Sequence, residues 1–290
     1  MNLTSSVRPR LIATDLDGTL LRSDGTVSER TREALTLAEA AGLCIVFVTG
    51  RPPRWMDTVR TLTGDHGIAI CSNGAAVYDV RRRELVSSVA LRPEDALAVV
   101  KALRAELPEV TFAFEYPSGY AAEQRYASPL WGDQAAQRVG TAEEILGSPE
   151  GDGVFKMLAR LPGLDPDEFL HRARAVAGQY AEITRSSPML EISALGVSKA
   201  TTLARWCEAR GVAAEEVVAF GDMPNDLPML DWAGTAFAVA NAHPLVLAAT
   251  AHHAADHDED GVAQVIESVV RGLGPTDGAD RRQPGGAAPR

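Results

Sequence analysis

Two acidic residues that directly follow a short apolar run constrain the fold of this chain more than any other feature. Residues 11–14 are apolar or small and predict a buried strand, with Asp15, Asp17 and Gly18 at its end. Glycine allows the tight turn that ends the strand and lets the backbone approach a ligand. Because neighbouring carboxylates repel each other, such a pair usually holds a cation or shares a proton. The alternative is an ordinary acidic turn, since Asp and Gly are common turn formers.

The overall charge and composition argue against several classes of partner. With 28 Lys and Arg against 39 Asp and Glu, the 290 residues carry a net charge of −11, which disfavours general binding of nucleic acid or of an anionic membrane. No segment has the apolar length needed to span a bilayer, and residues 1–10 lack the apolar core of a signal peptide. Cys44, Cys71 and Cys207 show no metal-binding spacing. We therefore expect a cytoplasmic protein without disulfides.

Alternating strand and helix patterns predict an α/β fold. Near-continuous apolar runs such as residues 43–48 are typical of strands buried on both faces of a parallel sheet. Strands are expected at residues 11–14, 43–48, 67–71, 217–220 and 236–240. Helices are expected at residues 28–41, 53–62, 198–210, 227–231, 244–250 and 262–271. This order predicts a doubly wound, mostly parallel sheet.

A segment of different character interrupts this pattern. Strands are expected near residues 85–90, 110–115, 154–159, 180–184 and 189–192, with helices at 93–107 and 165–177. The sequence therefore predicts a core formed by residues 11–81 and 188–272, with an α+β cap inserted at residues 82–187. We expect residues 1–10 to be flexible, and residues 273–290, which contain almost no large apolar side chain, to form a disordered tail.

Polar residues follow several of the expected strands. In an open parallel sheet, ligands bind outside the carboxyl ends of the strands, so residues at these ends should converge. They are Asp15, Asp17, Thr49, Gly50 and Asp222. Lys199 lies in the first turn of a helix, where backbone N–H groups also favour an anion. Carboxylates, a hydroxyl, amides and an ammonium together suit a phosphoryl group with a bound magnesium ion.

Four motifs in this order resemble those of the haloacid dehalogenase superfamily of phosphohydrolases. They are Asp15-Leu16-Asp17-Gly18-Thr19, Val48-Thr49-Gly50-Arg51, Gly196-Val197-Ser198-Lys199 and Gly221-Asp222-Met223-Pro224-Asn225-Asp226. Four further stretches are similar to those of the Cof-type sugar-phosphatase branch, which carries a large α/β cap: Ser72-Asn73-Gly74-Ala75, Leu190-Glu191-Ile192, Asn241-Ala242 and Asp260-Gly261-Val262-Ala263. Each motif alone is weak, but four in order are a strong signal. The cap matches that branch in size and position only.

The resemblance implies separate roles for the acidic residues. Asp15 would be the nucleophile that attacks phosphorus and forms an aspartyl-phosphate. Asp17 would protonate the leaving alcohol and then activate water to hydrolyse that intermediate. Mg²⁺ would be held by Asp15, Asp222 and the backbone carbonyl of Asp17. Asp226 would support either the metal or Lys199.

The resemblance also implies a set of residues that contact the substrate. The phosphate would be bound by Thr49, the Gly50 amide, Lys199 and Asn225. Arg51 either touches the substrate or only pairs with an acid, and Asn73 is a second candidate for a residue that faces the cleft. The implied activity is a magnesium-dependent phosphatase acting on a small phosphorylated metabolite. Sugar phosphates are the class of ester that this branch hydrolyses. The alternatives are a catalytically silent sugar-phosphate sensor and a phosphotransferase or mutase on the same fold.

Three other groups of residues carry weaker hypotheses. His252, His253 and His257, with Asp256 and Asp258 nearby, have a spacing that suits a transition metal, but the segment aligns with a loop of the family, so we do not expect a metal there. Lys156 belongs to no recognisable motif and is a cap residue that can face the substrate. The aromatic residues of the cap either line a sugar site or, as we expect, pack in its core: Tyr116, Tyr120, Tyr126 and Trp131.

Overall fold

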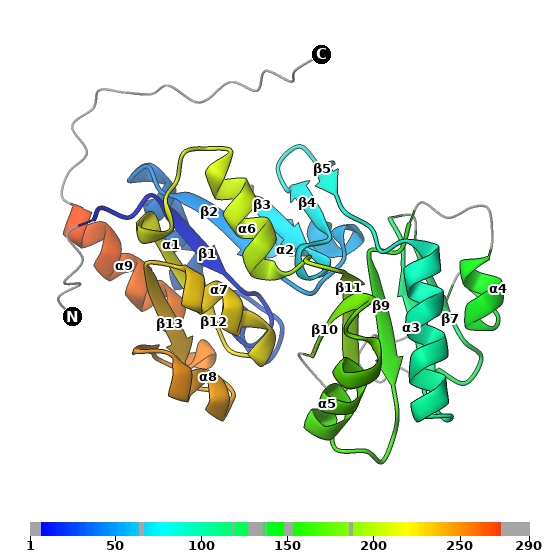
Figure 1. The fold of residues 1–290 in the computed structure, drawn as a ribbon. Coiled ribbons are helices and arrows are strands. Elements are labelled where there is room, and N and C mark those ends of the chain that lie inside the picture. Colours follow the sequence, from blue (N-terminus) through cyan, green and yellow to red (C-terminus); the bar gives the residue numbers. More distant parts are fainter. Residues whose placement is uncertain are drawn as a thin grey trace.

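The computed structural model describes residues 7–63, 67–117, 119–126, 136, 138–147, 153–185 and 188–273. The predicted disordered tail, apart from residue 273, lies outside the described residues, as do Trp131 and residues 1–6 of the expected flexible start. Two β-sheets, each flanked by helices, make up the described structure (Figure 1). The observed architecture confirms the predicted α/β class.

The larger sheet is mostly parallel. Its strands in spatial order are β14 (His252–Ala254), β13 (Thr235–Val239), β12 (Val217–Gly221), β1 (Leu11–Thr14), β2 (Cys44–Val48), β3 (Ile68–Cys71), β4 (Ala76–Asp79) and β5 (Glu84–Ser88). All neighbours from β14 to β3 are parallel, whereas β4 and β5 are antiparallel additions at one edge. The chain runs outward from β1 in one direction and returns at β12 in the other, so the sheet is doubly wound as predicted.

Helices cover both faces of this sheet. They are α1 (Glu29–Ala40), α2 (Met56–Thr63), α6 (Lys199–Glu208), α7 (Leu227–Trp232), α8 (Pro244–Ala249) and α9 (Gly261–Leu273), with a short 3-10 turn, η1 (Pro53–Trp55), before α2. α6 and α7 pack together in front of the sheet in Figure 1, and α1 packs against α9. Because helices lie on both faces, the strands in the middle are buried throughout; β1 and β12 contain no exposed residue.

Local signals explain where the key helices begin. The hydroxyl of Ser28 accepts the backbone N–H of Thr31 and so caps α1 at the start of the helix expected at residues 28–41. Ser198 caps α6 in the same way by accepting the N–H of Thr201. This cap sets the start of α6 at Lys199, whose side chain is almost completely buried.

The smaller sheet has helices on one face. Its strands in order are β10 (Ala181–Arg185), β11 (Leu190–Ala194), β9 (Lys156–Arg160), β6 (Thr111–Glu115), β7 (Tyr120–Ala122) and β8 (Arg138–Val139). Its helices are α3 (Pro93–Glu106), α4 (Ala142–Leu146) and α5 (Pro166–Ala177). Phe112 and Phe114 of β6 pack into the core beneath these helices, and Ala113 between them points to the opposite face. Glu115 and Lys156 lie directly opposite each other in register on that helix-free face.

Strand pairing shows where the two sheets divide the chain. β5, which follows residue 81, pairs with β4 in the larger sheet, and β11, which follows residue 187, pairs with β9 and β10 in the smaller one. The boundaries of core and cap remain a proposal, and these pairings favour placing them after β5 and after β11. Among the described helices, none combines the length and the apolar composition that a membrane crossing requires.

Candidate active site

Three neighbouring strands of the larger sheet bring the predicted polar residues together. β12, β1 and β2 lie side by side, and their carboxyl ends lead into Asp222, Asp15 and Thr49 respectively. The Lys199 ammonium, from the start of α6, reaches into the same place and donates to Asp15 Oδ1 and to Asp226 Oδ1, both at 2.7 Å. Residues as far apart in the sequence as Asp15 and Asp226 therefore converge at one edge of the sheet, as the sequence predicts.

The centre of the site is a buried excess of negative charge. Carboxylate oxygens of Asp15, Asp222 and Asp226 lie within 4.8 Å of one another, and these residues are only 5%, 6% and 0% exposed. Burial, followed by the charge of Asp226, raises the pKa of Asp222 to about 7. Burial also raises the pKa of Asp15 well above its usual range, although Lys199 acts in the opposite direction. Three acids against one ammonium fit a site for a divalent cation with oxygen ligands.

The acids of this cluster differ in what their oxygens already bind. Asp226 accepts from Lys199 through Oδ1, and its Oδ2 accepts the backbone N–H groups of Asp222 and Met223 at 3.1 and 3.0 Å. Both oxygens of Asp226 are thus engaged, which suits a supporting role. Asp222 accepts from the Thr19 hydroxyl at 2.8 Å through Oδ1. Thr19 therefore orients the Asp222 carboxylate toward the cluster.

Gly18 makes room for the Asp222 carboxylate. Its φ of +79° is a conformation that side-chain-bearing residues rarely adopt, and a Cβ there would lie 2.5 Å from Asp222 Oδ2. Asn241 Nδ2 also donates to the Gly18 carbonyl at 2.7 Å. The turn after β1 is therefore built around the position of Asp222.

We expect Gly18→Ala to lower kcat/KM by at least about tenfold, because the new methyl group displaces Asp222. The backbone strain alone costs about 1–2 kcal/mol of unfolding free energy. Gly25→Ala is the matched control, since Gly25 has a φ of +77° and nothing within 4 Å of its added Cβ. Denaturant unfolding should show the backbone cost in Gly25→Ala and at least that cost in Gly18→Ala, while steady-state kinetics should show a loss of activity in Gly18→Ala alone. Equal activity in the two variants would contradict this role of Gly18.

The loop after β2 contains a second group of predicted residues. Thr49 is fully buried, and its Oγ1 accepts the backbone N–H of Arg51 at 3.0 Å. The Arg51 guanidinium binds Asp17 with two hydrogen bonds of 2.8 and 2.5 Å. The sequence left two alternatives for Arg51, contact with the substrate and pairing with an acid. The observed geometry corresponds to pairing with an acid. The Asp17 side chain remains 57% exposed, so it is open to the space above the site.

Two asparagines complete the floor of the site. Asn225 Nδ2 donates to Asn73 Oδ1 at 3.4 Å, and both residues are more than nine-tenths buried. Asn73 adopts a left-handed conformation with φ of 56°, which asparagine tolerates better than most residues. Within the described chain, Asn73 Nδ2 and Asn225 Oδ1 have no hydrogen-bond partner. Buried polar atoms without partners are costly, so these atoms are suited to a polar ligand.

Comparison with known proteins identifies the family. The model of a family described as haloacid dehalogenase-like hydrolase matches residues 12–266. The chain belongs to this family. The putative phosphatase YxeH of Bacillus subtilis is 31% identical, with 90% of this chain and 98% of that protein covered. The pyridoxal phosphate phosphatase YbhA of Escherichia coli is 30% identical, with 89% and 98% covered. The structure of SMU.1108c from Streptococcus mutans has the same fold, with a TM-score of 0.79, 21% identity, and 91% and 99% covered.

Sequence reasoning overlooked several contacts around this haloacid dehalogenase-type site. Lys156 is expected only as a cap residue that can face the substrate, yet its ammonium donates to the Gly50 carbonyl across the boundary between the two sheets. Arg54 and Glu115 form an ion pair across the same boundary. A lysine or glutamate at the end of a strand gives no local signal of such a contact. Thr19 could have been found, because its hydroxyl follows Asp17 and Gly18 within the first motif.

The structure also bears on the hypotheses about the three histidines and the aromatic residues of the cap. His253 Nε2 lies 3.0 Å from the Leu247 carbonyl oxygen, and the His252 ring is tilted against that of Phe237. Of the three histidines, His257 is the one that belongs to a possible metal-binding group, with Asp256 and Asp258. The three histidines therefore do not share one site. The described tyrosines of the cap lie on both faces of its sheet: Tyr116 packs under the helices, and Tyr120 and Tyr126 pack on the other face.

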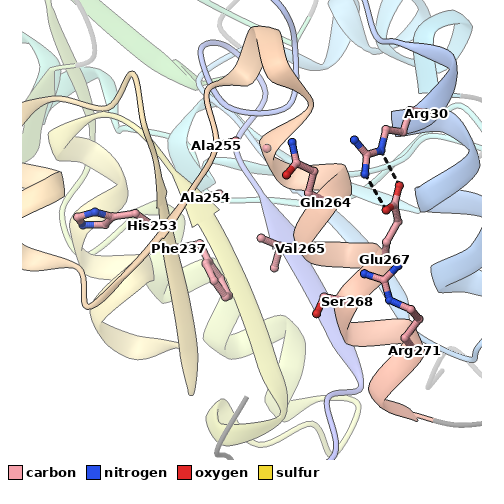
Figure 2. A pocket seen from close by; sticks show the side chains of 11 residues that line it. Arg30, Phe237, His253, Ala254, Ala255, Gln264, Val265, Glu267, Ser268 and Arg271 are labelled. Atoms are coloured by element: carbon pink, nitrogen blue, oxygen red, sulfur yellow. Dashed lines mark hydrogen bonds and ion pairs between the residues drawn. The ribbon is translucent and has the colours of Figure 1, made fainter. Parts of the chain in front are cut away.

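A separate pocket lies between α9 and the β13–β14 edge of the larger sheet (Figure 2). Arg30 and Glu267 at its rim bind each other with hydrogen bonds of 2.7 and 2.8 Å, so their charges are mutually compensated. None of the predicted catalytic or phosphate-binding residues lines it. This pocket is therefore not part of the candidate active site.

Proposed function

We propose that this protein is a magnesium-dependent phosphatase that hydrolyses small phosphate monoesters through an aspartyl-phosphate intermediate. The observation that carries the proposal is the position of Asp15: a buried carboxylate at the end of the central strand, held by Lys199 and adjacent to Asp222. Membership of a hydrolase family and two relatives named as phosphatases support the same reaction class.

The two acids of the first motif have environments that suit different tasks. Lys199 fixes one oxygen of Asp15 and leaves the other to attack phosphorus. Burial alone would lower the pKa of Lys199, but the charges of Asp15 and Asp226 outweigh it, so the ammonium stays charged. Asp17 is exposed enough to reach a leaving group, and Arg51 sets its orientation. Asp17 then gives a proton to the leaving alcohol and later takes one from the attacking water.

Donors around Asp15 suit the oxygens of a phosphoryl group. Because the Thr49 hydroxyl accepts the Arg51 N–H, its own proton is available for a phosphate oxygen. The Gly50 amide and the Lys199 ammonium supply further positive charge. The unpartnered amide nitrogen of Asn73 and the Asn225 side chain line the same region. We assign phosphate binding to Thr49, Gly50, Lys199 and Asn225, with Asn73 as an additional contact.

The donor set also suits the proposed magnesium ion. Asp15 and Asp222, with the Asp17 backbone carbonyl, would hold Mg²⁺, and Asp226 would support Lys199. When bound, the ion would offset the carboxylate charge that otherwise repels a phosphate monoester, and would polarise the phosphoryl oxygens. The chain itself holds the carboxylate oxygens of Asp15 and Asp222 close together and buries them.

Release of free phosphate tests the proposal. Purified protein should release inorganic phosphate from p-nitrophenyl phosphate when Mg²⁺ is present, and a panel of hexose phosphates, pentose phosphates and pyridoxal 5′-phosphate should identify the preferred ester. A sugar-phosphate sensor would bind panel members without turnover, although it has no need of an intact Asp15 and Asp17. A phosphotransferase or mutase would yield a phosphorylated acceptor in place of free phosphate. Either result would contradict hydrolysis as the function.

A further inference from the structure

A lysine of the smaller sheet is joined to the phosphate loop of the larger one. Lys156, at the start of β9, is 1% exposed, and its ammonium donates to the Gly50 carbonyl at 2.7 Å and to Glu191 Oε1 at 2.6 Å. Glu191 lies on β11 and is 2% exposed. A Cβ added to Gly50 would lie 3.1 Å from Glu191 Oε1 and 3.6 Å from Lys156 Nζ, so the pair sits directly on this loop.

The peptide group that Lys156 contacts also holds the Thr49 hydroxyl. The Gly50 carbonyl and the Arg51 N–H belong to one peptide unit, which is planar. The carbonyl accepts from Lys156 at one end, and the N–H donates to Thr49 Oγ1 at 3.0 Å at the other. Fixing the direction of the carbonyl therefore fixes the direction of the N–H. The ammonium also polarises the peptide, which strengthens the hydrogen bond to Thr49.

Stability does not account for this buried ion pair. Burying two charges costs about as much as their attraction returns, and apolar residues of similar volume are often equally stabilising. The pair is nevertheless placed at a contact between the two sheets, and one of its members reaches the loop that precedes Arg51. The remaining explanation is a role in the geometry of that loop.

We propose that Lys156 is a positioning residue that orients Thr49 from the cap. Through the Gly50–Arg51 peptide, docking of the smaller sheet sets the hydroxyl that binds phosphate, so cap position and phosphate affinity are coupled. The inference rests on the proposed function, because it takes Thr49 as a phosphate-binding residue.

The first test compares two ion pairs at the contact between the two sheets. Lys156→Met/Glu191→Gln removes both charges of one pair, and Arg54→Met/Glu115→Gln removes the other pair, which does not contact the Gly50 carbonyl. The probe is inorganic phosphate as an inhibitor of p-nitrophenyl phosphate hydrolysis. The inhibition constant should rise about tenfold in the first variant and less than about twofold in the second. If the first variant does not fold, Lys156→Met/Glu191→Leu replaces the ion pair with an apolar pair. The same rise in the inhibition constant is expected for it.

The second test asks whether Lys156 acts through Thr49. In a Thr49→Val background the Lys156→Met/Glu191→Gln change should no longer alter the inhibition constant, because the oriented hydroxyl is gone. If the Lys156→Met/Glu191→Gln and Thr49→Val changes raise the inhibition constant additively, the contact is merely structural and the inference is overturned. The inference is also overturned if Arg54→Met/Glu115→Gln weakens phosphate binding as much as Lys156→Met/Glu191→Gln does. If the wild-type protein hydrolyses the ester and binds phosphate while the Lys156 variants bind it equally well, only this inference fails. A wild-type protein that does neither overturns the proposed function itself.

Discussion

Asp15→Asn is expected to lower turnover of p-nitrophenyl phosphate by at least about a thousandfold, because an amide cannot act as the nucleophile. The replacement is nearly isosteric and keeps an oxygen that accepts from Lys199. It also removes one charge from a cluster in which burial has already raised the pKa of Asp15. Thermal unfolding of the metal-free variant should therefore show no loss of stability. Steady-state kinetics and a melting curve on the same preparation check both statements.

Asp17→Asn provides the contrasting control. Asp17 is exposed and lies outside the buried cluster, and its proposed task includes activating the water that hydrolyses the intermediate. With a good leaving group such as p-nitrophenol, this variant should still form the aspartyl-phosphate but lose it slowly. Intact-protein mass spectrometry should detect one added phosphoryl group in Asp17→Asn and none in Asp15→Asn. Turnover retained by Asp15→Asn would exclude the proposed nucleophile.

Periodicity and local caps made most of the core fold predictable. The apolar run of β2 indicated a strand buried on both faces, and Ser28 indicated the start of α1, and both are local properties of the sequence. Asp15, Thr49 and Asp222 could be placed at one site because the carboxyl ends of parallel strands meet at one edge of a sheet. Their chemical roles remain predictions that the variants above test.

Pairing between distant segments could not be predicted in this way. β5 reads as a short strand, but nothing in its residues says that it joins β4 and not the smaller sheet. β14 contains His252 and His253 and has no apolar pattern, so it was missed. The contact of Lys156 with Gly50 spans 106 residues and depends on how the two sheets dock. Such contacts are properties of the tertiary structure and leave no mark in a local window.

Removal of the divalent cation is expected to abolish turnover and to destabilise the protein as the pH rises. Asp222 has a pKa of about 7 in the folded chain because of burial and the charge of Asp226, against 3.8 for an ordinary Asp. The metal-free folded state therefore binds a proton between about pH 4 and pH 7 that the unfolded state has lost. This contribution therefore favours folding at acid pH and disappears as the pH rises through 7. Its size is up to about 4 kcal/mol.

Magnesium should replace the missing proton above neutral pH. We expect the rise in melting temperature on adding Mg²⁺ to be larger at pH 8 than at pH 5, because the ion competes with protons for the same carboxylates. Differential scanning fluorimetry after chelation and dialysis measures this without reference to activity. Calcium and potassium added at matched ionic strength distinguish a specific site from general screening.

Asp222→Asn separates metal binding from the electrostatics of the cluster. An amide in this position cannot titrate and carries no charge, so the metal-free variant should be more stable at pH 8 than the metal-free wild-type protein. The same variant should gain little from Mg²⁺, because one of the proposed ligands has lost its charge. Stability that rises with pH in the metal-free wild-type protein would contradict the charge imbalance at Asp15, Asp222 and Asp226. An unchanged magnesium response in Asp222→Asn would instead move the proposed metal site away from Asp222, while leaving that imbalance intact.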